Sequence, residues 1–314
     1  MNRDDVLRLV RGPSRPTLRQ LQHRRRRARA LFGVGLLALL LGLIVGANHG
    51  GPQQAKAASG RVGWYGHLKM LAGGGRGSLD LEQRAVENGA VDRALGATPF
   101  VRLGGRETRE IALTFDDGPG EYTERVLATL RRYSVPATFF EVGREVPGFP
   151  QSVQALTDAG MTIGDHSQDH PDFTTLSQRD QTAEIDDAAR AIQGTGAAAP
   201  RLFRPPYGAF NQTTRQLLAQ RRMLAVLWSV DSEDYTRPGV DQIVHNVVPA
   251  VFPGAIILMH DGGGDRSETV GALEQIIPEL KRQGYRFVSI PRLMLDNPPV
   301  AGDQGVQSGY DAAG

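Results

Sequence analysis

Cysteine is absent from the 314-residue sequence, which excludes disulfides, thiolate-bound metals and cysteine nucleophiles. Any metal site must therefore use His, Asp or Glu side chains. Aromatic residues are also few, at 6%, whereas hydrophobic residues reach 40%, which is enough for a buried core. Glycine and proline are plentiful, with 38 and 19 copies, and they predict many tight loops.

Negative charge is scarce at the start of the chain. Residues 1–30 contain ten Arg and two Asp, a net charge of +8. Subtracting this from the total of +2 leaves −6 for the other residues. A mildly acidic body is poorly suited to a phosphate backbone, so we expect no nucleic-acid partner. No feature of the sequence indicates a protein partner.

One long hydrophobic run, residues 31–47, directly follows the basic residues 1–30, which are expected to form a cytoplasmic tail. Its seventeen apolar residues lie near the short end of what spans a bilayer, and no charge follows until Lys56. The Arg-rich flank predicts a single-pass membrane anchor with a cytoplasmic N-terminus and an extracytoplasmic body. A signal peptide cleaved near Ala55-Lys56-Ala57, which would make the protein secreted, is the alternative.

Residues 48–108 are expected to form a linker or stalk between the anchor and the body. Residues 48–78 are rich in Gly, Ala and Gln, which is typical of a flexible spacer. Residues 79–95 have the apolar spacing of one amphipathic helix. At the other end, the Gly- and Pro-containing residues 293–314 are expected to form a flexible tail.

Strand-like and helix-like segments alternate through the body, residues 109–292. The strand-like runs are 111–115, 137–142, 161–165, 202–204, 224–229, 255–259 and 286–290. The helix-like runs are 123–133, 151–159, 178–193, 211–222, 240–249 and 267–283. This alternation predicts an α/β domain of parallel β/α units, as a barrel or an open sheet. In such folds the chemistry lies at the carboxyl ends of the strands.

Carboxylates and imidazoles follow two of the predicted strands. The first strand ends in Asp116 and Asp117, and adjacent carboxylates are costly unless a cation lies there or their protonation states differ. After the third strand, His166 and His170 are four residues apart and share one face if the segment turns helically. With a strand-end carboxylate, they form a two-His, one-Asp set for a divalent cation.

Three further strand ends carry unusual polar residues. Arg204 begins a stiff segment, Arg-Pro-Pro-Tyr-Gly, that is suited to holding a guanidinium against a carboxylate. Residues 228–235 contain three acids and two aromatic residues. His260 ends an apolar strand and precedes an Asp and a glycine run.

In this order, the five segments resemble the motifs of NodB-type polysaccharide deacetylases, carbohydrate esterase family four. The motifs read Thr-Phe-Asp-Asp-Gly-Pro, His-Ser-x-x-His, Arg-Pro-Pro-Tyr-Gly, Asp-x-x-Asp-aromatic and Leu-x-His, within about residues 109–292. Each motif is weak alone, but five in order are highly specific. The resemblance implies a distorted (β/α) barrel, here preceded by the transmembrane segment.

The resemblance also implies roles for the residues at the first three motifs. Asp117, His166 and His170 match the ligands of a divalent metal, usually Zn²⁺, with Co²⁺ or another transition ion as alternatives. Asp116 matches the catalytic base. Arg204 matches the residue that pairs with that base.

The remaining matches concern the acid and the walls of the site. His260 matches the general acid, and Asp234 the carboxylate that tunes it. Tyr207 matches the position whose backbone N–H helps to hold the oxyanion, and Leu258 a leucine that lines the acetyl pocket. Tyr235 stands where the family usually has Trp, so the contact with a sugar ring is expected to differ.

The implied reaction is metal-dependent N-deacetylation of an extracytoplasmic N-acetylhexosamine polymer, with peptidoglycan as the nearest example. A metal-activated water, a base and an acid on opposite sides of the bond are what amide hydrolysis requires. Deacetylation of chitooligosaccharides and O-acetyl ester cleavage on xylan would use the same parts. An iron oxygenase would share the ligand set but leave the base and the acid unexplained. An inactive glycan-binding domain on a membrane stalk would predict loss of a ligand or the base, and all are present.

Overall fold

The computed structural model of the protein describes residues 76–304. The predictions for residues 1–75 and 305–314, including the anchor at 31–47, lie outside this range. Within it, no helix is both long enough and apolar enough to cross a membrane.

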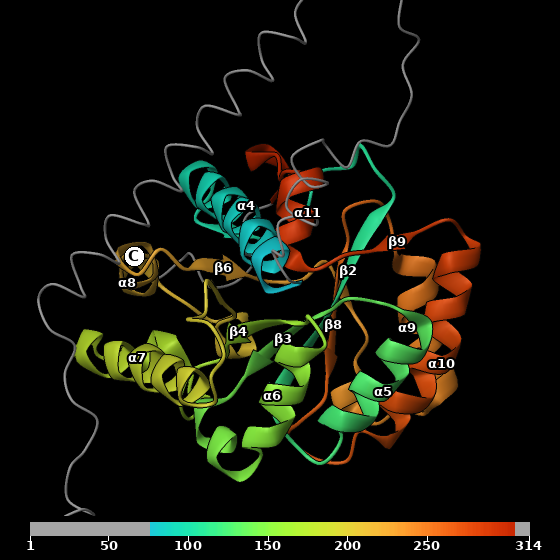
Figure 1. Cartoon of the computed structure of the whole chain (residues 1–314), viewed down its shortest axis with the longest axis horizontal. Coiled ribbons are helices and arrows are strands. Elements are labelled where there is room, and N and C mark those ends of the chain that lie inside the picture. The colour runs from blue at the N-terminus through green and yellow to red at the C-terminus, as the bar shows by residue number, and fades with distance from the viewer. Residues whose placement is uncertain (1–75, 305–314) are drawn as a thin grey trace, which may run out of the picture. The chain divides into compact units, whose positions relative to one another are not determined.

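The centre of the described part is one curled sheet of nine strands (Figure 1). The strands are β1 (Phe100–Val101), β2 (Glu110–Gly118), β3 (Thr138–Glu141), β4 (Thr162–Asp165), β5 (Leu202–Phe203), β6 (Leu224–Val226), β7 (Val230–Asp231), β8 (Ile256–His260) and β9 (Arg286–Phe287). Their order is β1-β6-β5-β4-β3-β2-β8-β7, with β9 beside β2, and all these pairs are parallel. A single antiparallel bridge joins Leu103, after β1, to Ala255, before β8. The prediction of parallel β/α units is confirmed, and the sheet curls back towards itself like a barrel.

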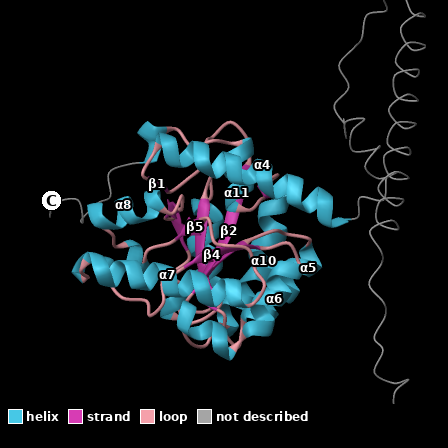
Figure 2. Cartoon of the chain, turned by 60° about the vertical axis from the view of Figure 1, so that its left-hand side comes forward, coloured by secondary structure: helices cyan, strands magenta, loops and turns pink. Residues whose placement is uncertain are grey.

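Helices surround the strands (Figure 2). They are α4 (Arg76–Ala97), α5 (Thr123–Tyr133), α6 (Pro150–Asp158), α7 (Gln178–Gly194), α8 (Gln212–Gln220), α9 (Val240–Val247), α10 (Ser267–Arg282) and α11 (Ile290–Asp296). Local sequence sets several of their ends. Ser177 accepts a hydrogen bond from the Asp180 N–H at the start of α7, and Asn211 with Thr214 forms a capping box at the start of α8.

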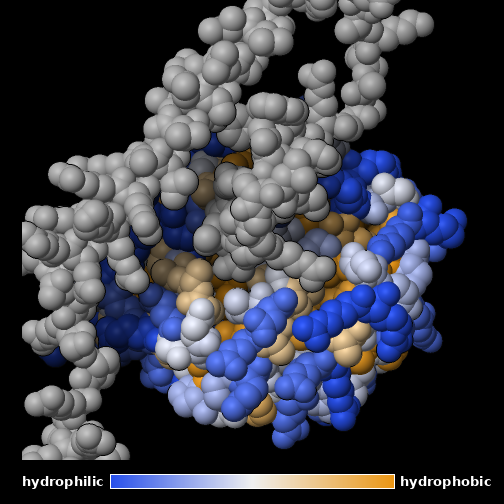
Figure 3. All heavy atoms as spheres, in the orientation of Figure 1, coloured by the Kyte–Doolittle hydropathy of each residue, from blue (hydrophilic) through white to orange (hydrophobic). Residues whose placement is uncertain are grey.

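Two apolar layers lie on the two faces of the sheet. On one face, Phe115 and Phe139 stack with ring centroids 5.0 Å apart, within the cluster that includes apolar residues of α5 and α10. On the other face, Phe140 and Ile256 belong to the cluster that α4 and α11 join. Because both faces are covered, the strands read as nearly continuous apolar runs. Hydrophilic side chains cover much of the outer surface visible in Figure 3, with smaller hydrophobic areas between them.

The structure differs from the expectation at both ends of the body. The helix expected at residues 79–95 is present as α4, but it lies beside α11, and β1 also lies within the expected linker (Figure 1). α11 and the 3₁₀ turn η6 (Ala301–Gln304) lie within the expected tail. Leu293 and Met294 are buried against α4, so apolar packing orders this segment. The expected strand 224–229 is shorter than predicted: β6 ends at Val226, and the next strand, β7, begins at Val230.

Candidate active site

The carboxyl end of β2 brings Asp116 and Asp117 to one place. In a regular strand two neighbouring side chains point to opposite faces. Here the register between β2 and β3 shifts between Asp116 and Gly118, and Asp117 has a φ of 68°. As a result both carboxylates lie near His166, whose Nε2 is 3.7 Å from Asp116 Oδ2 and 3.6 Å from Asp117 Oδ1.

The buried side chain of Arg204 holds the Asp116 carboxylate. Its Nη1 donates to Asp116 Oδ1 at 2.7 Å and to Thr114 Oγ1 at 2.8 Å. Its Nε and Nη2 donate to the backbone carbonyls of Val226 and Leu227. Arg204 is fully buried, and burial lowers its pKa, which the Asp116 carboxylate opposes. The predicted pairing of Arg204 with Asp116 is thus present in the structure.

Asp117, His166 and His170 form a set of possible metal ligands. One ligand atom from each lies within 4.8 Å of the others. The Nδ1 of His166 is 2.7 Å from the Arg204 carbonyl oxygen. Because a carbonyl only accepts, Nδ1 carries the hydrogen and the Nε2 lone pair faces Asp117. Two imidazoles and one carboxylate with this orientation fit a divalent cation.

The surroundings of His170 favour the neutral form of its imidazole ring. Its Nε2 lies 3.3 Å from Asp117 Oδ1. Burial, followed by the neighbouring His166, lowers the pKa of His170 to about 4, although the Asp117 and Asp116 carboxylates oppose the change. The ring is therefore unprotonated at neutral pH, as metal ligation requires.

The loop that carries both histidines is held by side chains. Ser167 and His170 have positive φ angles of 69° and 59°. Asp165 Oδ1 accepts from the Ser167 N–H at 2.7 Å, and Ser167 Oγ accepts from the His170 N–H at 3.0 Å. These bonds stabilise a conformation that non-glycine residues rarely adopt.

His260 and Asp234 form a second pair at the end of β8. The Nδ1 of His260 donates to Asp234 Oδ1 at 2.7 Å. Asp234 Oδ2 accepts from the His260 N–H at 2.9 Å and from Thr269 Oγ1 at 2.7 Å. Burial on its own would lower the pKa of His260, but the hydrogen bond to Asp234 and its charge outweigh burial and raise it. The same contacts lower the pKa of Asp234 against the effect of its own burial.

Three more predicted residues border the site. The Tyr207 ring packs edge-on against His170, with centroids 4.7 Å apart, and the Tyr235 ring packs edge-on against His260 at 5.4 Å. Both rings are among the most exposed large apolar side chains of the described residues. Leu258 is buried in β8, where it pairs with Thr114 of β2. Asp116 and His260 are also partners in that ladder. The other predicted residues lie at the carboxyl ends of neighbouring strands or just after them, so all ten lie around one end of the sheet.

Several buried acids near this end were not predicted. Burial, then the charges of Asp261 and Asp116, raises the pKa of Glu141 well above its usual range. Burial likewise raises the pKa of Asp261 to about 7, although a hydrogen bond from Thr123 opposes it. The others are Asp165, which is buried, and Asp231, which is half-buried, and burial raises the pKa of both. Each of the four lies at the carboxyl end of a strand or directly after it, and Asp231 also begins the Asp-x-x-Asp motif, so these were the available signals.

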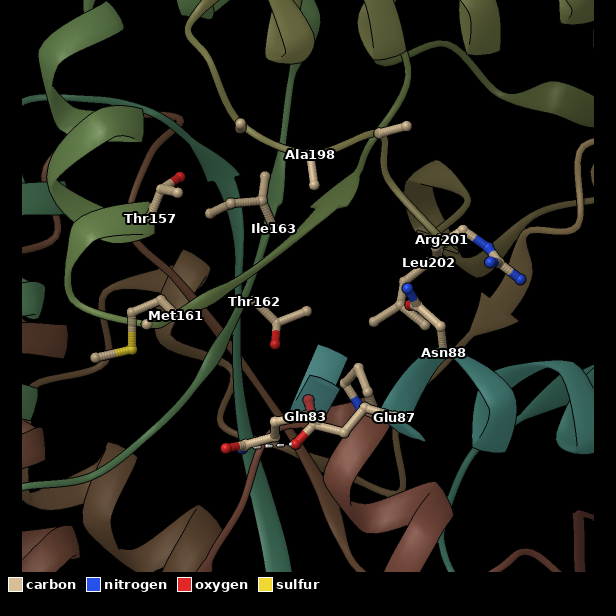
Figure 4. A pocket seen from close by; sticks show the side chains of 14 residues that line it. Gln83, Glu87, Asn88, Thr157, Met161, Thr162, Ile163, Ala198, Arg201 and Leu202 are labelled. Carbon is tan, nitrogen blue, oxygen red and sulfur yellow. Dashed lines mark hydrogen bonds between the residues drawn. The ribbon is translucent and has the colours of Figure 1, made fainter. Parts of the chain in front are cut away.

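A separate hollow of about 840 Å³, counting open solvent, lies at the opposite ends of β4 and β5 (Figure 4). Thr162 and Leu202, the first residues of those strands, line it. Gln83 and Glu87 of α4 border it and share a hydrogen bond of 3.0 Å. None of the residues predicted to be functional lines this hollow.

Comparison with known proteins identifies the family. The family described as "Polysaccharide deacetylase" matches residues 104–226. A chitooligosaccharide deacetylase of Bradyrhizobium sp. is 40% identical over 199 residues, which is 59% of this chain and 91% of the relative. A peptidoglycan-N-acetylglucosamine deacetylase of Bacillus cereus is 42% identical over 187 residues, which is 59% of this chain and 87% of the relative.

The solved structures agree with these relatives. The crystal structure of a peptidoglycan N-acetylglucosamine deacetylase in complex with an N-oxidanyl-benzamide compound has a TM-score of 0.62 and 33% identity. The match covers 65% of this chain and 96% of that structure. The chain therefore belongs to the polysaccharide deacetylase family and is a deacetylating hydrolase.

Proposed function

We propose that this hydrolase depends on a divalent metal and removes N-acetyl groups from peptidoglycan outside the cytoplasm. The observation that carries the proposal is the grouping of three units around one end of the sheet. These units are the Asp116–Arg204 pair, the possible ligand set beside it, and the His260–Asp234 pair. They supply a base, a cation site and an acid, which together suit amide hydrolysis.

Asp116 is the proposed base. A divalent ion, most simply Zn²⁺, held by Asp117, His166 and His170 would lower the pKa of a water molecule and polarise the acetyl carbonyl. Asp116, oriented by Arg204, accepts the proton of the attacking water. The backbone N–H of Tyr207, which has a φ of 59°, donates to the acyl oxygen as negative charge develops there.

His260 is the proposed acid. The amine of a sugar cannot leave as an anion, so it must be protonated as the C–N bond breaks. Because Nδ1 of His260 donates to Asp234, its Nε2 is the nitrogen left to give a proton to the amine. The raised pKa of His260 keeps more of the ring protonated near neutral pH. Leu258 would line the space for the acetyl methyl group.

Two variants test these roles. We expect Asp116→Asn and His260→Ala to lower the rate of acetate release by about 10²–10⁴-fold, the usual contribution of a general base or acid. The control is His245→Ala, which removes an exposed imidazole on α9 and should leave the rate unchanged. Robust activity in both test variants, assayed with added zinc or cobalt, would contradict the mechanism.

The polymer is proposed from two considerations. Relatives include enzymes named for peptidoglycan and for chitooligosaccharides, so the family alone does not choose between them. The expected anchor at residues 31–47 would place the enzyme beside the cell wall, which favours peptidoglycan. We expect faster acetate release from purified peptidoglycan than from chitin oligomers or acetylxylan. The reverse order would identify a chitooligosaccharide deacetylase or an O-acetyl esterase.

We also propose that the chain is membrane-bound with its catalytic part outside. The basis is the basic tail of residues 1–30 followed by the apolar run. We expect the full chain to sediment with membranes and to stay there after a high-salt wash, whereas a chain without residues 1–47 should be soluble. Recovery of a chain that begins near residue 58 from the medium would instead support the cleaved signal.

A further inference from the structure

The turn between β7 and the 3₁₀ turn η4 (Asp234–Thr236) contains an acid that the proposed mechanism does not use. This acid is Asp231, the last residue of β7, which pairs with Leu258 of β8 and is half-buried. Its Oδ1 accepts a hydrogen bond of 2.9 Å from the backbone N–H of Glu233. Asp231 thus lies one short turn before Asp234, the partner of His260.

Glu233 has a backbone conformation that is costly for a residue with a side chain. Its φ and ψ angles are 55° and 22°, in the left-handed region. For a residue with a Cβ atom this conformation costs about 1–2 kcal/mol. An Asp side chain that binds the N–H two residues later is the standard way to hold such a turn. The Asp231 bond therefore offsets the cost of the left-handed Glu233.

The direction of the chain at Glu233 decides where Asp234 points. Asp234 is almost fully buried, and its two oxygens make three bonds to groups outside the turn: the ring and the N–H of His260, and the Thr269 hydroxyl. Other contacts also hold the turn, and among them the Thr236 hydroxyl donates to the Glu233 carbonyl oxygen at 2.8 Å. Ser232 Oγ accepts from the Asp234 N–H at 3.3 Å, and Asn246 Nδ2 donates to the Ser232 carbonyl at 3.0 Å. If Glu233 left its conformation, Asp234 could not keep all three bonds.

We propose that Asp231 is a positioning residue for the acid: its carboxylate holds Glu233 left-handed and thereby aims Asp234 at His260. The inference rests on the proposed role of His260 as the proton donor. Asp231 acts in it through the backbone and not through contact with substrate. Strain at a few residues next to a reacting group is a recurrent feature of enzyme sites.

Asp231→Ala is the first test. We expect kcat to fall by about tenfold, less than the ~10²–10⁴-fold that loss of a general acid costs, with KM nearly unchanged. The charged groups that face His260 are Asp234, Asp116, Asp117, Asp231 and Asp261. Because Asp234 raises the pKa of His260, its misplacement should move the alkaline limb of the pH profile to lower pH. A simple loss of folded protein would reduce the rate without moving that limb.

Two double variants isolate the backbone effect. Glycine adopts the left-handed conformation without the Cβ penalty. Adding Glu233→Gly to Asp231→Ala should therefore restore most of kcat and the position of the alkaline limb. Adding Glu233→Ala is the matched control, since it removes the same side chain but keeps a Cβ, and it should restore neither. Asp231→Asn should behave like the native enzyme, because its amide oxygen can still accept from the Glu233 N–H.

The opposite pattern would overturn the inference. If Asp231→Asn were as impaired as Asp231→Ala and glycine gave no rescue, Asp231 would act through its charge. A rise in KM at constant kcat would make it a substrate contact. The pKa of His260, followed by NMR in the same variants without substrate, separates this inference from the proposed function. Absence of acetate release by the native enzyme would contradict the proposed function, whereas the NMR comparison would still test the role of Asp231.

Discussion

At the scale of single residues, the most demanding feature is the buried pair of Arg204 and Asp116. The guanidinium of Arg204 is fully buried, and its Cζ lies 4.2 Å from the centroid of the Phe140 ring. The charge is tolerated because Thr114 and two backbone carbonyls also accept hydrogen bonds from it. Such a pair holds Asp116 in one orientation, but it makes each partner dependent on the other.

This dependence can be measured. We expect Arg204→Met to lower the free energy of unfolding by about 3–5 kcal/mol, because it leaves Asp116 as a buried charge without its partner. The double variant Asp116→Leu/Arg204→Met removes both charges and should regain much of that loss while remaining inactive. Urea unfolding of the single and double variants provides the comparison. If the loss of unfolding free energy in the double variant equalled the sum of the losses in the two single variants, the two charges would not be coupled.

The His260–Asp234 pair predicts a pH effect of known sign. Asp234 raises the pKa of His260, although burial opposes the change. Asp234→Asn removes the negative charge and leaves burial, so the pKa of His260 should fall. Because the acid must be protonated, the alkaline limb of kcat/KM should move to lower pH. Thr269→Val removes one hydrogen bond to Asp234 but keeps the charge of Asp234. The alkaline limb of this variant should therefore lie much closer to that of the native enzyme.

At the scale of elements, α4 and α11 join parts of the chain that the sequence left outside the body. Leu293 of α11 is buried in the cluster that contains Val91 of α4. We expect Leu293→Ala to cost about 2–5 kcal/mol of unfolding free energy, as for other large-to-small core substitutions. The control Val86→Ala changes an exposed position of α4 and should cost less than about 0.5 kcal/mol. Equal losses of unfolding free energy in the two variants, measured by urea unfolding, would show that the packing of α11 on α4 does not stabilise the protein.

The elements also show where sequence reasoning succeeds and fails. The expected helix at 123–133 coincides with α5, because its apolar spacing reports one buried face. α11 was missed because Ile290 continues the apolar run of β9, whereas Ser289 caps a helix that only the contact with α4 stabilises. In the site, strand-end residue types were enough to find Asp116, Arg204 and His260. Asp231 was marked only as the first residue of the Asp-x-x-Asp motif, and Asp165 was not marked at all. Their contacts depend on the positive φ angles of Glu233 and Ser167, which the sequence does not show.

At the scale of the whole molecule, the proposed cation would link segments that are far apart in the chain. Asp117 lies next to the last residue of β2, whereas His166 and His170 follow β4, and the three meet only in the folded protein. A ligand that binds the native state alone stabilises the whole domain by mass action. Metal content and global stability should therefore change together.

Removal of the metal makes this link testable. We expect a chelator to abolish acetate release and lower the Tm, and added Zn²⁺ at 100 times its Kd to restore about 2.7 kcal/mol of stability. Asp117→Asn should lose both the metal and the Zn²⁺-dependent rise in Tm, because a neutral amide replaces the only carboxylate of the proposed ligand set. Asp116→Asn, one residue earlier, should keep most of the rise and still be inactive, since Asp116 is assigned to the proton and not to the ion. Equal losses of metal in the two variants would show that the adjacent carboxylates do not divide these roles.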